Sequence, residues 1–207
     1  MLIKVDKNPN GLNRNMYKKG SFELEPGVTI LVGCNGAGKT TLLMEIKDFC
    51  NENDIDCIHY DNHTQGRNTT SAAIYSGNIS LAATSMVSSE GENIIINLGQ
   101  VAGRIGNMMR RLPEDSPVVI LLDAVGSGFS IDNIMDIKTN LFKMLFDYNT
   151  KRDLYIVVST NEFEFAYGEK CLDVQNMKYR TFKTYDSYKK FILKSREIKD
   201  KRDYEEE

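Results

Sequence analysis

The sequence contains little of what marks several common protein classes. Its 207 residues include only four cysteines and two histidines. The cysteines show no spacing typical of a zinc site or a disulfide framework, and two histidines do not favour an all-histidine metal site. No apolar run is long enough to cross a bilayer, and the formal net charge of −3 gives no overall electrostatic footprint for nucleic acid. These absences disfavour membrane-spanning, disulfide-rich and strongly basic classes.

The length and the first residues favour a cytoplasmic protein. A chain of 207 residues suits one domain, with at most a small appendage. The segment Met1–Asp6 becomes charged at once, so we expect no signal peptide and no membrane association. Cysteines without paired spacing favour a reducing compartment, and the simplest such compartment is the cytoplasm.

The most informative stretch runs from residue 28 to residue 43. Residues 28–32, Val-Thr-Ile-Leu-Val, are rich in β-branched side chains and predict a buried strand. The loop Gly-Cys-Asn-Gly-Ala-Gly-Lys-Thr follows at residues 33–40, and a helix is expected to continue from Thr41 to Cys50. This is the phosphate-binding pattern G-x-x-x-x-G-K-T in its required context of strand, loop and helix.

The residue types of this loop match the chemistry of a nucleoside triphosphate. Glycines let consecutive backbone N–H groups turn toward one point, and a helix N-terminus adds free donors and the positive end of its dipole. Lys39 would contact the β- and γ-phosphates, and the Thr40 hydroxyl would ligate Mg²⁺. We therefore expect ATP and Mg²⁺ to bind here. The expected ATP-binding residues are Asn35, Gly36, Ala37, Gly38, Lys39, Thr40 and Thr41.

Three further residues are candidates for the same site. Residues 118–123, Val-Val-Ile-Leu-Leu-Asp, predict a buried parallel strand that ends in a carboxylate, and Asp123 would hold Mg²⁺, often through water. Gln65 follows a predicted strand at 56–60; it could touch Mg²⁺ and the attacking water, or be a solvated loop amide. Tyr17 could place its ring on an adenine, or lie in a surface loop.

The remaining pattern alternates strands with helices. We expect strands at 2–6, 21–25 and 154–160, a hairpin at 171–183, and helices at 93–112, 130–147 and 186–201. This order predicts an α/β fold of the P-loop NTPase kind, in which helices flank a mostly parallel sheet and an antiparallel β portion lies at the N-terminus. We divide the chain into a phosphate-loop domain, residues 1–185, and a charged C-terminal helix and tail, residues 186–207.

Taken in order, the motifs resemble those of the ABC-type ATPases and, more loosely, the SMC-like head ATPases of DNA maintenance. The phosphate loop contains the Asn-Gly pair usual in that group, and Ser-Glu-Gly-Glu at 89–92 looks like its signature motif before a long helix. Residues 118–123 match its aspartate-bearing strand, 127–132 look like its D-loop, and Asn161 stands at its switch position. The compact chain, without a coiled-coil insertion, is similar to small phage or mobile-element ATPases.

The resemblance implies an ATP-dependent homodimer. Each ATP would lie between the phosphate loop of one subunit and the signature turn of the other, formed by Ser89, Gly91 and Glu92. It also implies a protein partner of unknown identity, and a role in DNA maintenance or phage defence. Direct DNA binding has little support from the residues, because acidic side chains interleave the basic ones of the last helix, Lys189, Lys190, Lys194, Arg196 and Lys199.

Three positions depart from the pattern of that group. The catalytic glutamate position carries Ala124, the switch histidine position carries Asn161, and the signature has Glu90 where glycine is usual. Alanine cannot orient or deprotonate a water molecule. Glu162, beside the switch position, and Gln65 are therefore the candidate catalytic residues.

These features leave three functions open. The first is an ABC or SMC-like ATPase that dimerises on ATP and acts as a slow hydrolase or an ATP-gated switch. The second is a nucleotide-dependent binding module with negligible hydrolysis, which Ala124 and Asn161 favour. The third is a P-loop kinase for a small substrate, in which Arg110 and Arg111 would be transition-state cations, although a solvated helix end explains that pair more simply.

Overall fold

The computed structural model describes residues 1–9, 15–61, 102–103, 105–126, 129–147 and 151–204. Its strands form two sheets. A short antiparallel pair joins β1 (Leu2–Lys4) to β2 (Ser21–Glu23). The larger sheet has the order β4-β5-β6-β3-β7-β8 and comprises β3 (Gly27–Val32), β4 (Asp56–Asp61), β5 (Val118–Asp123), β6 (Leu154–Ser159), β7 (Lys170–Asp173) and β8 (Lys178–Arg180).

The larger sheet is parallel except for β8, which pairs antiparallel with β7. The register aligns Leu31 of β3 with Ser159 of β6, and Asp61 of β4 with Asp123 of β5. The carboxyl ends of four strands therefore meet along one edge of the sheet. The expectation of an α/β fold with a mostly parallel sheet and an N-terminal antiparallel portion is confirmed.

Alternate side chains of the central strands enter two separate cores. On β5, Val118, Ile120 and Leu122 join one core, whereas Val119 and Leu121 join the other. The β6 and β3 strands divide in the same way. This period of two follows from the pleat of a strand, and it explains why both faces of a parallel strand must be apolar.

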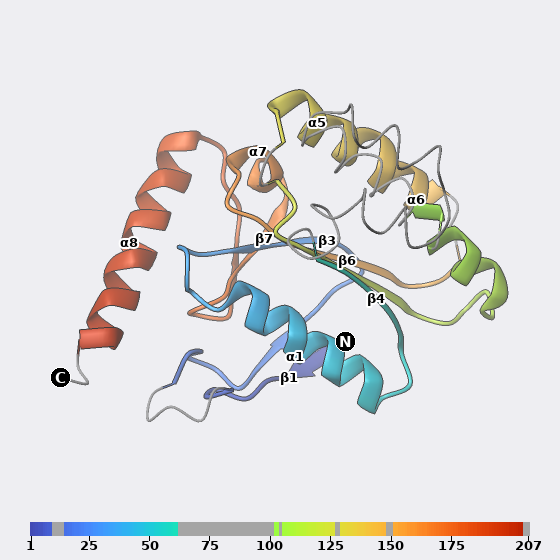
Figure 1. Ribbon diagram of the computed structural model, residues 1–207, viewed down its shortest axis with the longest axis horizontal. Helices are drawn as coiled ribbons and strands as arrows, with labels where there is room; N and C mark the ends of the chain where they lie inside the picture. Colours follow the sequence, from blue (N-terminus) through green and yellow to red (C-terminus); the bar gives the residue numbers. More distant parts are fainter. Residues whose placement is uncertain (10–14, 62–101, 104, 127–128, 148–150, 205–207) are drawn as a thin grey trace, which may run out of the picture.

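Helices cover both faces of the sheet, which is seen nearly edge-on in Figure 1. One face packs against α1 (Lys39–Glu52) through Leu42, Leu43 and Ile46. The other packs against α5 (Ile131–Asp136), the π-helical segment η2 (Ile137–Phe142), α6 (Lys143–Asp147) and a helical stretch at 105–111. The short α7 (Phe163–Ala166) follows β6, and α8 (Tyr185–Tyr204) runs along one end of the molecule.

The predicted elements match the structure where the sequence pattern is strong. The strand expected at 118–123 has those bounds, and those expected at 28–32, 56–60 and 154–160 differ by one residue at one end. The helix expected at 130–147 is instead three segments with a π-helical middle, and α7 was not predicted. No helix among the described residues is long and apolar enough to span a membrane.

Candidate functional site

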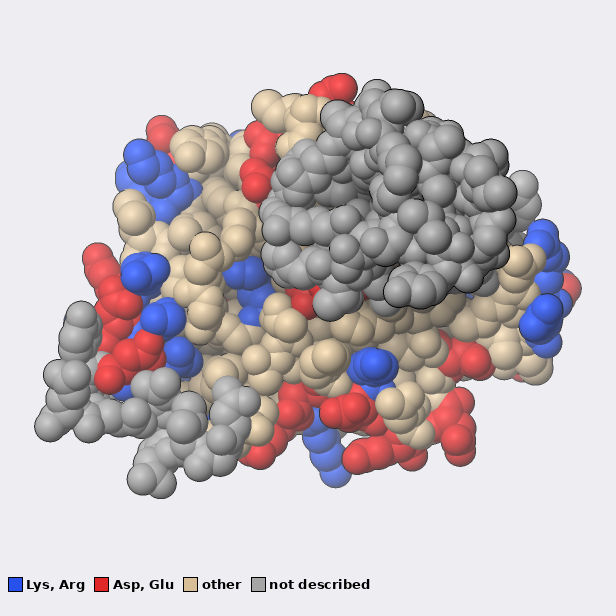
Figure 2. Space-filling model, viewed as in Figure 1, with Lys and Arg blue, Asp and Glu red and all other residues tan. Residues whose placement is uncertain are grey.

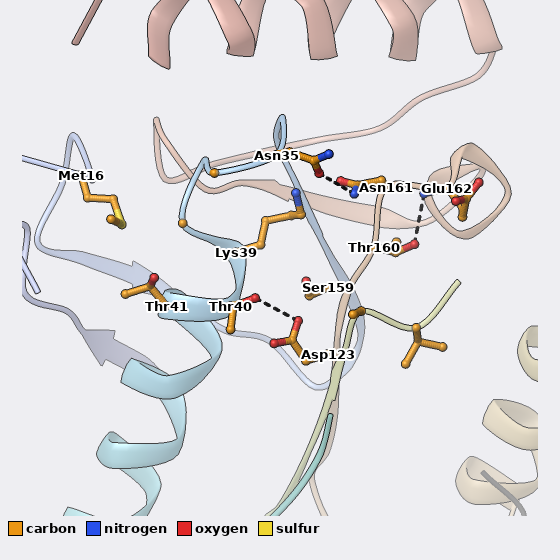
Figure 3. A pocket seen from close by; sticks show the side chains of 14 residues that line it. Met16, Asn35, Lys39, Thr40, Thr41, Asp123, Ser159, Thr160, Asn161 and Glu162 are labelled. Atoms are coloured by element: carbon orange, nitrogen blue, oxygen red, sulfur yellow. Dashed lines mark hydrogen bonds between the residues drawn. The ribbon is translucent and has the colours of Figure 1, made fainter. Parts of the chain in front are cut away.

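A cavity of about 570 Å³ opens at the carboxyl edge of the sheet. It lies where β3, β5 and β6 end and where α1 begins (Figure 3). Its lining residues are Met16, Asn35, Gly36, Gly38, Lys39, Thr40, Thr41, Asp123, Ala124, Val125, Ser159, Thr160, Asn161 and Glu162. The structure therefore brings the residues predicted from three separate stretches of sequence into one site.

The phosphate loop, as we name residues 33–40, wraps one side of the cavity. Gly36 and Gly38 have backbone φ angles of 77° and 97°, which residues with a Cβ atom rarely adopt. Gly38 is the N-cap of α1, and a Cβ built there would lie 2.5 Å from the sulfur of Met16. The first turn of α1 has no acidic side chain to neutralise its dipole. The N-terminus of α1 therefore offers backbone donors and partial positive charge to an anion.

Lys39 is held back against the phosphate loop. Its ammonium group donates hydrogen bonds to the backbone carbonyls of Gly33, at 2.9 Å, and of Cys34, at 3.1 Å. Burial lowers the pKa of Lys39 from its ordinary value, while the Cys34 thiol and the Asp123 carboxylate oppose that shift. A cation that burial destabilises gains from a nearby anion, so Lys39 is suited to a phosphate group.

Thr40 and Asp123 form the polar centre of the cavity. The hydroxyl of Thr40, in the first turn of α1, donates a hydrogen bond to the Asp123 carboxylate at the end of β5, at 3.3 Å (Figure 3). Asp123 is 3% exposed. Two hard oxygen ligands at one point fit Mg²⁺, which takes one or two carboxylates and completes its shell with water and phosphate. No group of three or more His, Cys, Asp or Glu able to hold a metal occurs among the described residues.

The segment after β6 forms the opposite wall of the cavity. The Asn161 side-chain amide donates to the Asn35 side-chain carbonyl at 2.7 Å, which joins this segment to the phosphate loop (Figure 3). Glu162 lines the cavity, and burial, followed by the charge of Glu164, raises its pKa above the ordinary value. Gly126 permits this arrangement, because a Cβ there would lie 2.9 Å from Cγ of Glu162.

Ala124 lies in the cavity wall directly after the buried carboxylate of Asp123. Its φ angle of 53° is in the left-handed region, where a residue with a Cβ is strained. ABC-type ATPases, which the motifs resemble, carry a catalytic glutamate at this position, and here the side chain is only a methyl group. Among the described residues that line the cavity, Glu162 and Asp123 are the two that carry a carboxylate.

The structure contradicts both readings of Tyr17 and the less favoured, kinase-like reading of the Arg110–Arg111 pair. Tyr17 neither lies in a surface position nor offers its ring to a ligand, because its side chain is fully buried and its hydroxyl donates to the Gly38 carbonyl at 3.0 Å. Arg111 lies beside Asp56, the first residue of β4, at the edge of the sheet opposite to the cavity. The Arg110–Arg111 pair is therefore remote from Lys39, and its assignment as transition-state cations of a kinase fails.

Several predicted residues lie outside the described part of the chain. These are Gln65, the signature residues Ser89, Glu90, Gly91 and Glu92, and Ser127 and Gly128 of the D-loop-like segment. Residues 205–207 of the predicted tail also lie outside the described residues, whereas Tyr188 and Ser195 of α8 form hydrogen bonds to the candidate site. Figure 2 shows acidic and basic side chains intermingled over this end of the molecule. Arg196 and Lys199 pair with Asp200 and Asp203, respectively.

No sequence pattern indicated a role for three residues at or behind the site. Met16 lines the cavity, and Tyr188 and Ser195 of α8 form hydrogen bonds to its walls. One signal was available in the sequence. Ser195 follows Tyr188 by seven residues, so a small hydroxyl occupies the same helix face as the apolar residues of α8.

Comparison with known proteins assigns no family to the chain. No protein-family model matches the sequence, and no characterised protein matches it either.

Proposed function

We propose that the chain is an ATP-binding ATPase of the ABC or SMC-like type with a P-loop NTPase fold. It binds ATP with Mg²⁺ on the phosphate loop and acts as a slow ATPase or an ATP-gated switch. The observation that carries the proposal is the meeting of Thr40 and Asp123 at 3.3 Å beside Lys39. Chance glycine turns do not bring a loop threonine, a loop lysine and a buried strand-end aspartate into one cavity.

Each described residue of the site has a part in holding ATP. The N-terminus of α1 and the glycines of the phosphate loop offer N–H groups to the β-phosphate, and Lys39 turns from loop carbonyls to the β- and γ-phosphates. When bound, Mg²⁺ neutralises phosphate charge, and Thr40 and Asp123 are the residues that would hold it. Asn35 and Asn161, whose side chains are joined by a hydrogen bond, would contact the terminal phosphate from opposite walls.

Hydrolysis at this site requires a base for the attacking water. In the proposed reaction water adds to the γ-phosphorus, the bond to the β,γ-bridging oxygen breaks, and Glu162 accepts a proton from the water. ADP and inorganic phosphate are the products. A raised pKa makes Glu162 a better proton acceptor than an ordinary glutamate, although its position beside the switch residue is not the usual one in the resembled group. Ala124 supplies no carboxylate, so we expect slow turnover.

We further propose that ATP joins two copies of the chain and that the dimer acts on a protein partner or on DNA. A second cavity adjoins the first and shares Asn35, Asn161 and Glu162 with it. Its rim includes Ile131 and Leu193, which are 62% and 57% exposed. Exposed apolar side chains beside a ligand site are typical of interaction surfaces, and this supports closure of a second copy over the phosphate loop.

Single-turnover hydrolysis separates the two forms of this proposal. Purified protein in excess over labelled ATP should form ADP slowly, and Glu162→Gln should slow ADP formation by about 10²–10⁴-fold while ATP binding persists. If wild-type protein binds ATP and forms no ADP over hours, the hydrolase is excluded and the nucleotide-dependent binding module remains.

The molar mass of the protein in solution, with and without ATP, tests the proposed dimer. Light scattering should report a dimer for wild-type protein with ATP and a monomer without it, and Ser89→Arg should bind ATP as a monomer. A Ser89→Arg protein that dimerises normally on ATP would contradict the sandwich arrangement.

A further inference from the structure

The last helix, α8, presents a buried face to the nucleotide cavity. Tyr188 and Ser195 are 4% and 1% exposed, and they are seven residues apart, which places them on one side of the helix two turns from each other. Each forms a hydrogen bond to a different wall of the cavity. We predicted from the sequence that residues 186–207 form a separate charged helix and tail. That prediction does not explain why one face of α8 is buried against the cavity walls.

Ser195 is bound to the phosphate loop. The Cys34 N–H donates to the Ser195 hydroxyl at 3.0 Å, and this hydroxyl donates to the Gln175 side-chain carbonyl at 2.6 Å. The Gln175 amide returns a hydrogen bond to the Ser195 backbone carbonyl at 3.2 Å. These three bonds fix the hydroxyl as acceptor from the loop and donor to Gln175. The backbone of Cys34 is thereby held against α8 at the start of the phosphate loop.

Tyr188 is bound to the opposite wall. Its hydroxyl donates to the Asn161 backbone carbonyl at 2.9 Å, and the Asn161 side chain bridges to Asn35 of the phosphate loop. Its ring is fixed by an edge-on contact with Phe182, with centroids 5.1 Å apart. Burial raises the pKa of Tyr188, so the hydroxyl keeps the proton that it donates. The bonds from Tyr188, Asn161 and Ser195 thus link both walls to one helix.

We infer that Tyr188 and Ser195 are positioning residues of the nucleotide site, one for each wall. Ser195 holds the phosphate loop, which contacts the phosphates that ATP and ADP share. Tyr188 holds Asn161, which faces the terminal phosphate that ADP lacks. The inference rests on the proposed function, and it predicts that the two residues affect nucleotide binding differently.

The first test compares Tyr188→Phe with Tyr185→Phe. Phenylalanine at 188 keeps the ring and removes only the hydroxyl, and Tyr185 is a 59% exposed tyrosine on the same helix. Calorimetric titration with Mg-ATP and with Mg-ADP should show that Tyr188→Phe weakens ATP binding about fivefold, the effect of one lost neutral hydrogen bond, and leaves ADP binding nearly unchanged. Tyr185→Phe should bind both nucleotides like wild type.

The second test compares Ser195→Ala with Ser187→Ala. Alanine at 195 leaves the buried Cys34 N–H without its acceptor, and we expect ATP and ADP binding to weaken together, by about tenfold. The Ser187 hydroxyl donates to the Thr184 backbone carbonyl at the exposed start of α8. Loss of the Ser187 hydroxyl should therefore change neither the ATP nor the ADP affinity. If Ser195→Ala does not fold, Tyr188→Phe still decides the inference.

A purely structural role would lower the melting temperature and leave the affinities of the folded protein for both nucleotides unchanged, and for Tyr188→Phe the ratio of ATP to ADP affinity would stay that of wild type. A Tyr188→Phe protein with that behaviour overturns the positioning role. Wild-type protein that binds neither nucleotide overturns the proposed function and this inference with it, whereas wild-type binding with both variants unchanged overturns the inference alone.

Discussion

Gly38 and Gly27 form a matched pair that tests whether the phosphate loop is shaped for close approach. Both have positive φ angles, 97° and 116°, so alanine at either position is strained by about 1–2 kcal/mol. Their surroundings differ. A Cβ at Gly38 would lie 2.5 Å from the Met16 sulfur and 3.2 Å from Cε1 of the buried Tyr17 ring, whereas a Cβ at Gly27 meets nothing within 4 Å.

The stability cost follows from these distances. Overpacking adds about 1–3 kcal/mol to the strain at Gly38, so Gly38→Ala should lose about 2–5 kcal/mol and Gly27→Ala only the strain. Urea unfolding of both variants measures the difference. Binding should separate them further, because Gly38→Ala displaces the N-terminus of α1 and should weaken Mg-ATP at least about tenfold. Gly27 begins β3 at the opposite edge, and its variant should bind normally. Equal losses of stability or of ATP affinity in the two variants would show that close contacts around Gly38 do not shape the phosphate loop.

The remaining predictions concern the metal and the hydrolysis step. Thr40→Val should lose roughly tenfold in ATP affinity with Mg²⁺ and little in its absence, whereas Thr40→Ser should retain the gain from Mg²⁺; titrations with Mg²⁺ and with EDTA compare them. Glu162 acts as a base only when ionised, and because its pKa is raised, the single-turnover rate should fall on acidification at a higher pH than for an ordinary glutamate. Glu162→Gln should remove that pH dependence together with about 10²–10⁴-fold of the rate. Ala124→Glu should raise the single-turnover rate and Ala124→Gln should not; a rate unchanged by Ala124→Glu would contradict the assignment of position 124 as the catalytic glutamate position of the resembled group.

The sequence predicted the parts of the site that depend on local pattern. The strand, loop and helix around Lys39 and the strand that ends at Asp123 follow from short-range rules, namely β-branched runs, glycine spacing and apolar continuity. Parallel strands place their carboxyl ends at one edge, so the meeting of these two segments also follows from the pattern.

The contacts that the sequence did not predict join residues far apart in the chain. Cys34 and Ser195 are 161 positions apart, and Asn35 and Asn161 are 126 apart. No periodicity encodes such pairs. The Cys34–Ser195 pair depends on how α8 packs against the sheet, and the Asn35–Asn161 pair depends on β6 lying next to β3. Tyr17 was misassigned for the same reason. A tyrosine in a polar stretch resembles a surface residue until the phosphate loop folds over it and its hydroxyl reaches Gly38.

Calorimetric titration of Mg-ATP into wild-type protein and into Lys39→Ala measures whether the phosphate loop binds ATP. Lys183→Ala is the control, since Lys183 is an exposed lysine outside the cavity lining. We expect saturable binding to wild type and to Lys183→Ala, and none detectable to Lys39→Ala. Wild-type protein without affinity for Mg-ATP, or a Lys39→Ala protein that binds it as wild type does, would show that the phosphate loop is not an ATP site.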